Sequence, residues 1–149
     1  MNTLLHIFEG KKFVDMLLDS SYEAYIDIGC NIGRLTNFVA SYARPKRIIG
    51  VDPNPNCYNL CLTTQKMHPG NTTISYIQCG IGDHERDEKL QFIAGENFSG
   101  TASFSKDLSH LQSHDALSSA KSHIVTFDHL FTSNKLQEYK KFLIKIDVE

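Results

Sequence analysis

Hydrophobic residues recur along this chain with two different spacings, which separate predicted strands from predicted helices. Short apolar runs rich in β-branched residues stand at 24–28, 47–51, 74–78 and 142–148, and such runs are typical of strands buried in a parallel sheet. Between them, as in the stretch 32–42, apolar residues return every three to four positions, the spacing of an amphipathic helix. Strands that alternate with helices predict an α/β fold with a parallel central sheet.

The segment before the first strand has a helical pattern. An apolar stripe of Phe13, Met16, Leu17 and Leu18 precedes the polar residues 19–21, so we expect residues 1–23 to be mostly helical and to pack against the sheet. We therefore divide the chain into an N-terminal helical segment, residues 1–23, and one α/β domain, residues 24–149.

The region after the third predicted strand departs from the alternating α/β pattern. Residues 79–83 read as the exit of that strand. For the stretch that follows, the pattern predicts a charged turn at 84–88, a short strand at 89–93, a weak helix at 108–120, a short strand at 123–127 and a brief helix from Asp128.

A glycine-containing turn joins the first predicted strand to the helix after it. Asp27 stands near the end of the strand, Gly29 and Gly33 follow, and the second strand ends in Asp52. Glycine allows a positive φ and a close approach of a ligand to the main chain. A strand, such a turn and a helix form half of a nucleotide-binding βαβ unit, in which an acidic residue at the second strand accepts hydrogen bonds from ribose hydroxyls.

The spacing of the glycines distinguishes between cofactors. A dinucleotide fingerprint G-x-G-x-x-G that starts at Gly29 requires glycine at positions 31 and 34, where this chain has Asn31 and Arg34. An acid-x-G-x-G-x-G pattern, associated with S-adenosylmethionine, departs only at Asn31.

Three motifs in order resemble the FkbM-type family of class I S-adenosylmethionine-dependent methyltransferases. They are D-x-G-x-N-x-G at 27–33, acid-P-N-P at 52–55 and K-I-D-V-E at 145–149. The resemblance implies a Rossmann-like class I methyltransferase fold, S-adenosylmethionine as cofactor, and O-methylation of a small-molecule or sugar hydroxyl.

The resemblance and the residue chemistry together give a set of candidate site residues. Asp27 is expected to receive the cofactor's ammonium group, and Asp83 is either an adenine contact or a turn former. The expected cofactor-binding residues are Asp27, Gly29, Cys30, Asn31, Gly33, Asp52, Pro53, Asn54 and Asp83.

The last predicted strand supplies the candidate catalytic residues. Lys145, Asp147 and Glu149 share one face of that strand, and charges there are costly unless they are paired or open to a cleft. We expect Asp147 and Glu149 to be catalytic, with Asp147 as the first candidate for a general base and Lys145 neutralising one of the two. A metal held by these carboxylates is a weaker alternative, and we expect no metal centre.

Composition excludes several function classes. The 149 residues are 41% hydrophobic and 21% charged, with a formal net charge of −2, so nothing favours binding to nucleic acid or acidic membranes. No apolar run is long enough for a membrane span, and no basic start with an apolar stretch marks a leader. We expect a cytoplasmic protein that acts on a small-molecule acceptor, with its oligomeric state open.

Two alternative functions remain open, and the resemblance also implies something about the end of the chain. An NAD-dependent oxidoreductase, opposed by Asn31 and Arg34, and a non-catalytic cofactor-binding remnant are the alternatives. The family continues after K-I-D-V-E with more helices and three strands, so the resemblance implies a fold that is incomplete at the C-terminus. We then expect 142–148 to form a sheet edge, and the chain to associate and to show no turnover.

Overall fold

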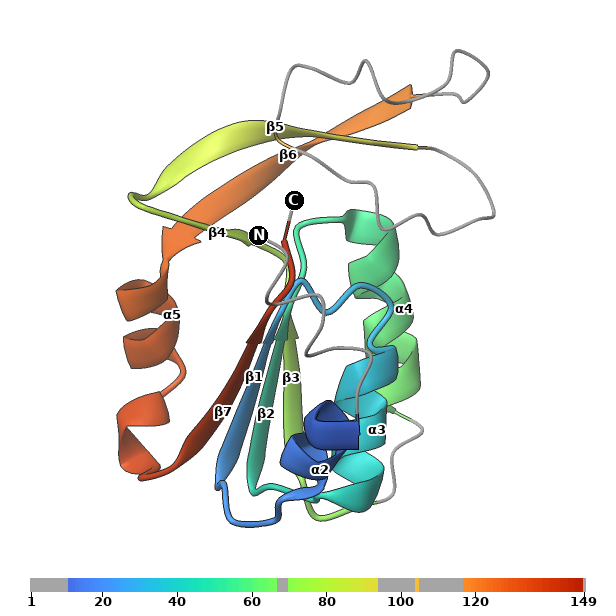
Figure 1. The fold of residues 1–149 in the computed structure, drawn as a ribbon. Helices are drawn as coiled ribbons and strands as arrows, with labels where there is room; N and C mark the ends of the chain where they lie inside the picture. Colours follow the sequence, from blue (N-terminus) through green and yellow to red (C-terminus); the bar gives the residue numbers. More distant parts are fainter. Residues whose placement is uncertain (1–10, 67–69, 94–103, 105–116, 149) are drawn as a thin grey trace.

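The computed structural model describes residues 11–66, 70–93, 104 and 117–148 (Figure 1). Its main sheet has four strands in the order β3-β2-β1-β7, and all three neighbouring pairs are parallel. The strands are β1 (Ala24–Ile28), β2 (Arg47–Val51), β3 (Thr73–Ile77) and β7 (Phe142–Ile146). The predicted α/β fold with a mostly parallel sheet is confirmed, and each strand lies within a residue or two of its expected bounds.

Helices cover both faces of this sheet (Figure 1). On one side lie α2 (Lys11–Leu18), α3 (Arg34–Tyr42) and α4 (Pro55–Gln65), and on the other lie α5 (Phe127–Ser133) and the 3₁₀ helix η1 (Leu136–Glu138). Alternate side chains of the strands point to the two faces. Tyr25 and Ile48 therefore pack under α2 and α3, whereas Ile26 and Ile49 pack with Leu130 of α5.

Helix α2 packs on the core with a narrower face than the sequence suggests. Phe13 and Leu17, one helical turn apart, are buried. Met16 and Leu18 flank Leu17 on the helix and are each 42% exposed, so the expectation that they belong to the buried stripe is wrong. The part of the expected helical segment before residue 11 lies outside the described residues.

A second, three-stranded sheet stands beyond the carboxyl ends of the main strands (Figure 1). Its order is β4-β6-β5, with β4 parallel and β5 antiparallel to β6. The strands are β4 (Gly80–Gly82), β5 (Arg86–Ile93) and β6 (Leu117–Thr126).

The second sheet corrects three sequence predictions. The expected exit at 79–83 contains a strand, the turn expected at 84–88 is strand from Arg86 onward, and 117–120 is strand instead of weak helix. Residues 108–116 lie outside the described residues. Cross-strand pairs account for the second of these differences, because Asp87 of β5 pairs with Lys121 at 2.6 Å and with His123 at 3.0 Å, both on β6. Such pairs stabilise a ribbon whose residues lack apolar alternation.

Strand β7 forms an edge of the main sheet in the part of the chain that the structure describes. Its outward side chains Ile144 and Ile146 are 42% and 56% exposed, and Val148 beyond them is 62% exposed. Lys145 between them is buried. The expected edge strand with exposed apolar residues is present, and the charged residue Lys145 near its carboxyl end is buried.

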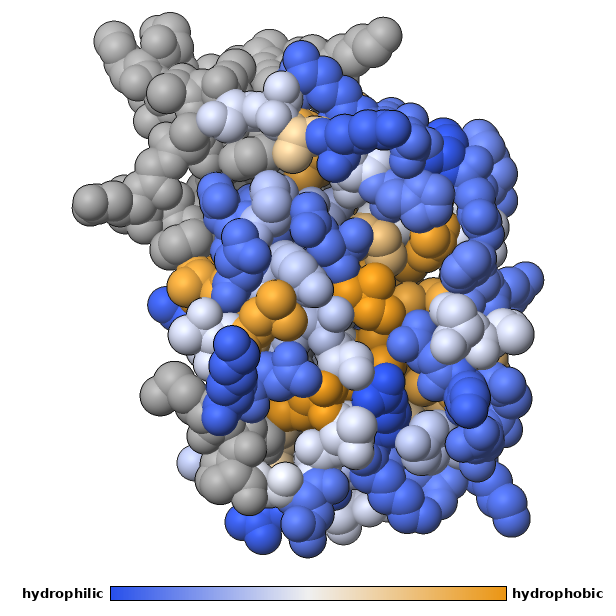
Figure 2. Space-filling view, turned by 180° about the vertical axis from the view of Figure 1, so that it is seen from behind, coloured by the Kyte–Doolittle hydropathy of each residue, from blue (hydrophilic) through white to orange (hydrophobic). Residues whose placement is uncertain are grey.

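The surface opposite to the view of Figure 1 is mainly hydrophilic, with hydrophobic residues gathered near its centre (Figure 2). Among the described helices, none has the length and apolar character needed to cross a membrane.

Candidate functional site

A pocket opens where the four parallel strands end. Its cavity measures about 320 Å³, within the range of small-molecule sites, roughly 300–1,000 Å³. The chain leaves β1 toward β2 on one side, whereas β7 pairs on the other, so this is the topological switch point at which open α/β sheets bind ligands. The lining residues are Ile28, Gly29, Asn31, Val51, Asp52, Pro53, Asn54, Cys57, Cys79, Gly80, Ile81, Phe104, Asp147 and Val148.

The turn after β1 has three residues in the left-handed region, Gly29 (φ 76°), Asn31 (φ 50°) and Gly33 (φ 74°). Glycine and asparagine adopt this conformation at the lowest cost. The space beside both glycines is also filled by protein: a Cβ on Gly29 would lie 1.9 Å from the carbonyl oxygen of Asp147, and one on Gly33 would lie 2.8 Å from the hydroxyl of Tyr76. Both glycines are therefore required by the packing of the turn as well as by its backbone conformation.

Asp52 connects this turn to the end of β2. Its Oδ2 accepts a hydrogen bond from the backbone N–H of Asn31 at 2.8 Å, and its Oδ1 accepts one from the N–H of Asn54 at 2.9 Å. Burial raises the pKa of the Asp52 carboxyl, and these two bonds oppose the shift. Each oxygen keeps a further lone pair, and the half-buried side chain lines the pocket.

Helix α4 begins directly beside Asp52. Asn54 is its N-cap and accepts a hydrogen bond from the N–H of Asn56, with Pro55 at the first helical position, where both residue types are favoured. Cys57 and Cys61 point from α4 toward the turn: the Cys57 thiol donates to Asn31 Oδ1 at 3.4 Å, and the Cys61 thiol to the Asn31 carbonyl at 3.1 Å. These contacts fix Asn31 on its side that faces α4.

Asp27 is fully enclosed and lies outside the pocket lining. Its Oδ2 accepts a hydrogen bond from Thr36 of α3 at 2.7 Å, and its Oδ1 lies 3.1 Å from the ammonium nitrogen of Lys145. Burial raises the pKa of the Asp27 carboxyl, and the Lys145 ammonium and the Thr36 hydrogen bond oppose that shift. Asp27 therefore links the end of β1 to Thr36 of α3 and to Lys145 of β7.

Asp147 lies on the opposite wall of the pocket, just after β7. Its side chain is 68% exposed and its Oδ2 lies 3.5 Å from the Lys145 nitrogen. Its backbone N–H donates to the Ile28 carbonyl at 3.0 Å, which fixes it beside the end of β1. Glu149, the other expected catalytic residue, lies outside the described residues.

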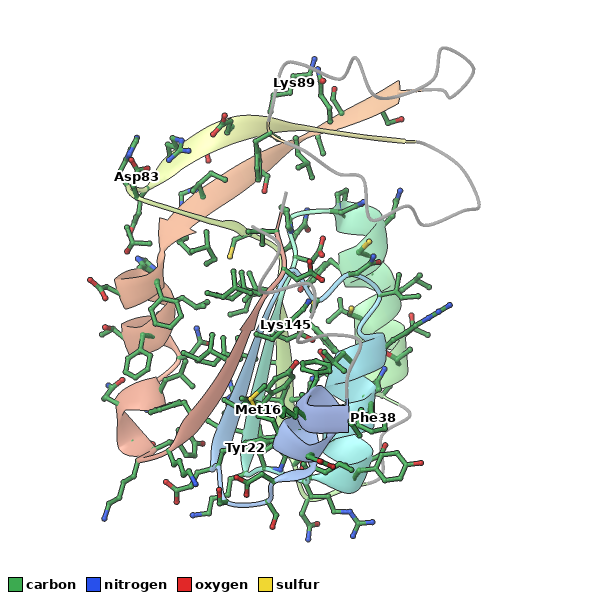
Figure 3. The ribbon with its side chains drawn as sticks, in the orientation of Figure 1. Met16, Tyr22, Phe38, Asp83, Lys89 and Lys145 are labelled. Atoms are coloured by element: carbon green, nitrogen blue, oxygen red, sulfur yellow. The ribbon has the colours of Figure 1, made fainter. Side chains whose placement is uncertain are left out.

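The structure brings six of the expected site residues together in the pocket and places four elsewhere. Gly29, Asn31, Asp52, Pro53, Asn54 and Asp147 line the pocket. Asp27 near the end of β1 and Cys30 and Gly33 within the turn are buried and are absent from the lining. Asp83 lies at the outer turn between β4 and β5, far from Lys145 (Figure 3), and pairs with Arg86 at 3.0 Å and His84 at 2.8 Å.

Sequence reasoning missed much of the apolar lining, which includes Cys57, Ile81 and Phe104. Cys57 follows Asn54 within the first turn of α4, and Ile81 follows the end of β3, so the rule that ligands bind at strand ends could have found both. Phe104 had no such signal. Within the described residues, no group of three or more His, Cys, Asp or Glu side chains could hold a metal ion.

Comparison with known proteins shows the family of this chain. Residues 27–149 match the family model described as "Methyltransferase FkbM domain". The chain belongs to the FkbM methyltransferase family. A segment of 51 residues is also 35% identical to "Putative methyltransferase 235L" of Invertebrate iridescent virus 6, a match that covers 34% of this chain and 19% of the viral protein. The family model begins at Asp27 and so includes the turn, Asp52 and β7.

Proposed function

We propose that this FkbM domain binds S-adenosylmethionine, and that the protein it belongs to transfers the methyl group to a hydroxyl of a small molecule or sugar. The observation that carries this proposal is the pocket at the ends of the four parallel strands, with the fixed carboxylate of Asp52 on its wall.

The charges of the pocket fit this cofactor. Among the described lining residues, Asp52 and Asp147 are ionisable acids, and none is a lysine, arginine or histidine. S-adenosylmethionine carries a cationic sulfonium and a cationic ammonium, which two carboxylates attract. NAD instead carries an anionic pyrophosphate, which such sheets hold at the helix N-terminus after the first strand. Here Gly33, at the start of α3, is buried and absent from the lining.

Residues of the pocket divide into a polar and an apolar part. Asp52 is suited to accept hydrogen bonds from the ribose hydroxyls, because both of its oxygens are already oriented by backbone N–H groups. Apolar residues suited to pack against adenine are Cys57, Cys79, Ile81 and Phe104. Gly29, which meets the Asp147 carbonyl, lines the side nearest Asp147, where the methionine part would lie.

Chemistry at the site requires positioning and one proton transfer. The bound cofactor supplies a methyl group attached to a positively charged sulfur. Asp147, exposed at the pocket and held beside β1, is suited to orient an acceptor hydroxyl and to take its proton on the carboxylate. Glu149 is proposed as its catalytic partner from the K-I-D-V-E motif. Asp27 contributes indirectly, since it is enclosed and acts on the site through Lys145.

Calorimetric titration of the 149-residue chain with S-adenosylmethionine, S-adenosylhomocysteine and NAD⁺ tests the proposal. We expect saturable binding of the first two ligands and none of NAD⁺. Binding of NAD⁺ with no binding of S-adenosylmethionine would favour the oxidoreductase alternative and overturn the proposal.

A further inference from the structure

Lys145 occupies an unusual position for a lysine. It is the fourth of the five residues of β7, opposite Asp27 in the parallel register with β1, and its side chain is only 8% exposed. Its neighbours in the strand, Ile144 and Ile146, are 42% and 56% exposed. Burying an ammonium instead of an apolar side chain is costly unless polar partners compensate for the lost water. The oxygens that surround the Lys145 ammonium therefore indicate its role.

Three oxygens from three different positions surround the Lys145 nitrogen. It donates a hydrogen bond to the Gly29 carbonyl at 2.7 Å, and lies 3.1 Å from Asp27 Oδ1 and 3.5 Å from Asp147 Oδ2. An ammonium has three donors and no acceptor, and this one faces an enclosed carboxylate, the turn after β1 and the pocket wall. Figure 3 shows Lys145 in the region of the main sheet, away from Asp83 and Lys89 of the second sheet.

Gly29 and Asp147 also meet directly. The Asp147 carbonyl occupies the place where a Cβ of Gly29 would be, and the Asp147 N–H donates to the Ile28 carbonyl at 3.0 Å. The end of β1 and the end of β7 therefore form one interlocked unit. Lys145 contacts both halves of this unit, through the Gly29 carbonyl and the Asp147 carboxylate.

We propose that Lys145 is a positioning residue for the cofactor site, which sets the path of the Gly29–Asn31 turn and the orientation of Asp147 by binding the Gly29 carbonyl, Asp27 and Asp147 at once. The inference rests on the proposed function for its consequence, cofactor affinity. A purely structural role would be limited to neutralising Asp27. In that case, removing both charges together should leave the cofactor affinity unchanged, whereas a positioning role predicts that the affinity falls.

The test uses three variants of the full chain: Lys145→Met, Lys145→Met combined with Asp27→Asn, and Lys89→Met as a control. Lys89 is exposed on β5, at the outer side of the second sheet (Figure 3). Lys145→Met leaves the Asp27 carboxylate buried without its partner, so we expect it to unfold easily or fail to fold. The double variant removes both charges and keeps a fold that can be titrated.

Positioning by Lys145 predicts that the folded double variant binds S-adenosylmethionine at least about tenfold more weakly than the unmodified chain. The Lys89→Met variant should bind as the unmodified chain does. Wild-type affinity in the double variant would show that Lys145 only neutralises Asp27, and would overturn the inference.

A second readout separates this inference from the proposed function. If the unmodified chain binds no S-adenosylmethionine, the proposed function fails, and the amide NMR signals of Gly29, Cys30 and Asn31 then test the turn alone. We expect these signals to shift in the double variant relative to the unmodified chain and to the Lys89→Met control. Unchanged signals would overturn the positioning role.

Discussion

The backbone N–H of Asn31 donates a hydrogen bond of 2.8 Å to the carboxylate of Asp52. This bond joins the turn after β1 to the end of β2, two segments separated by α3. Asn31 is placed for it by its positive φ, and Asp52 is placed by a second bond from Asn54. The carboxylate that we assign to the ribose is thus oriented before any ligand arrives, which lowers the cost of binding.

Replacing Thr36 by valine should destabilise the fold by about 1.5–3 kcal/mol, because it removes a hydrogen bond to a buried charged group. Thr36 is fully buried and donates to Asp27 at 2.7 Å. The control is Thr64→Val on α4, whose hydroxyl donates to the Cys61 carbonyl from a half-buried position. Urea denaturation measures both, and equal losses for the two variants would argue against a special role of the Asp27 contact.

Replacing Gly29 by alanine should lower the free energy of unfolding by at least about 2 kcal/mol. The left-handed conformation at φ 76° disfavours any side chain, and the added methyl would meet the Asp147 carbonyl at 1.9 Å. Either β1 or β7 has to move to relieve this contact. An unchanged denaturation midpoint would show that the two strand ends are not interlocked as described.

Acidification should weaken binding of adenosine through Asp52. Burial raises the pKa of this carboxyl above that of the unfolded chain, so folding favours the protonated form and Asp52 itself does not destabilise the fold as pH falls. The protonated carboxyl, however, has lost acceptor capacity. Titrations with adenosine from about pH 8 to about pH 4.5 should show its affinity falling at a pH above the range in which an ordinary aspartate side chain is protonated.

Adenosine is the suitable probe because it lacks the ammonium and carboxylate of the full cofactor. Asp52→Asn should bind more weakly and with a flat profile over the same range. Circular dichroism at each pH confirms that the chain stays folded. A profile in the unmodified chain as flat as that of Asp52→Asn would contradict the assigned role.

The main sheet and the turn chemistry could be predicted from the sequence because local patterns specify them. Buried parallel strands are short and apolar, and both features are visible in 24–28 and 47–51. Asn54 and Pro55 mark the start of α4 by their own chemistry. Asp52 could be predicted as a site residue because it stands at the end of the second strand, where such sheets bind ligands.

The strands predicted at 89–93 and 123–127 are present within β5 and β6. The full extent and pairing of the second sheet and the partner of Lys145 could not be predicted, because they depend on contacts between distant segments. Strand β6 is rich in serine and gains its stability from pairing with β5, which local propensity does not show. The alternation of β7 placed Lys145 with Asp147 on one face. It did not reveal that β1 brings the buried Asp27 within 3.1 Å of the Lys145 nitrogen.

The exposed edge of β7 should make the chain associate as its concentration rises. Ile144 and Ile146 are largely exposed, and within the described residues β7 is paired with β1 alone, an arrangement that favours edge-to-edge pairing. Replacing Ile146 by lysine should reduce association, because a charge on an edge strand opposes it. Light scattering over a concentration series measures the effect, and a monomer at every concentration would contradict the prediction.

The central claim, that the pocket at the strand ends binds S-adenosylmethionine through Asp52, is tested most directly by calorimetry on Asp52→Ala. The account predicts that the binding free energy of S-adenosylmethionine becomes less favourable by about 1.5–3 kcal/mol, the scale of hydrogen bonds to a charged group. Asp128→Ala, at an exposed position in the first turn of α5, is the matched control and should bind as the unmodified chain does. Unchanged affinity in a folded Asp52→Ala variant would contradict the account.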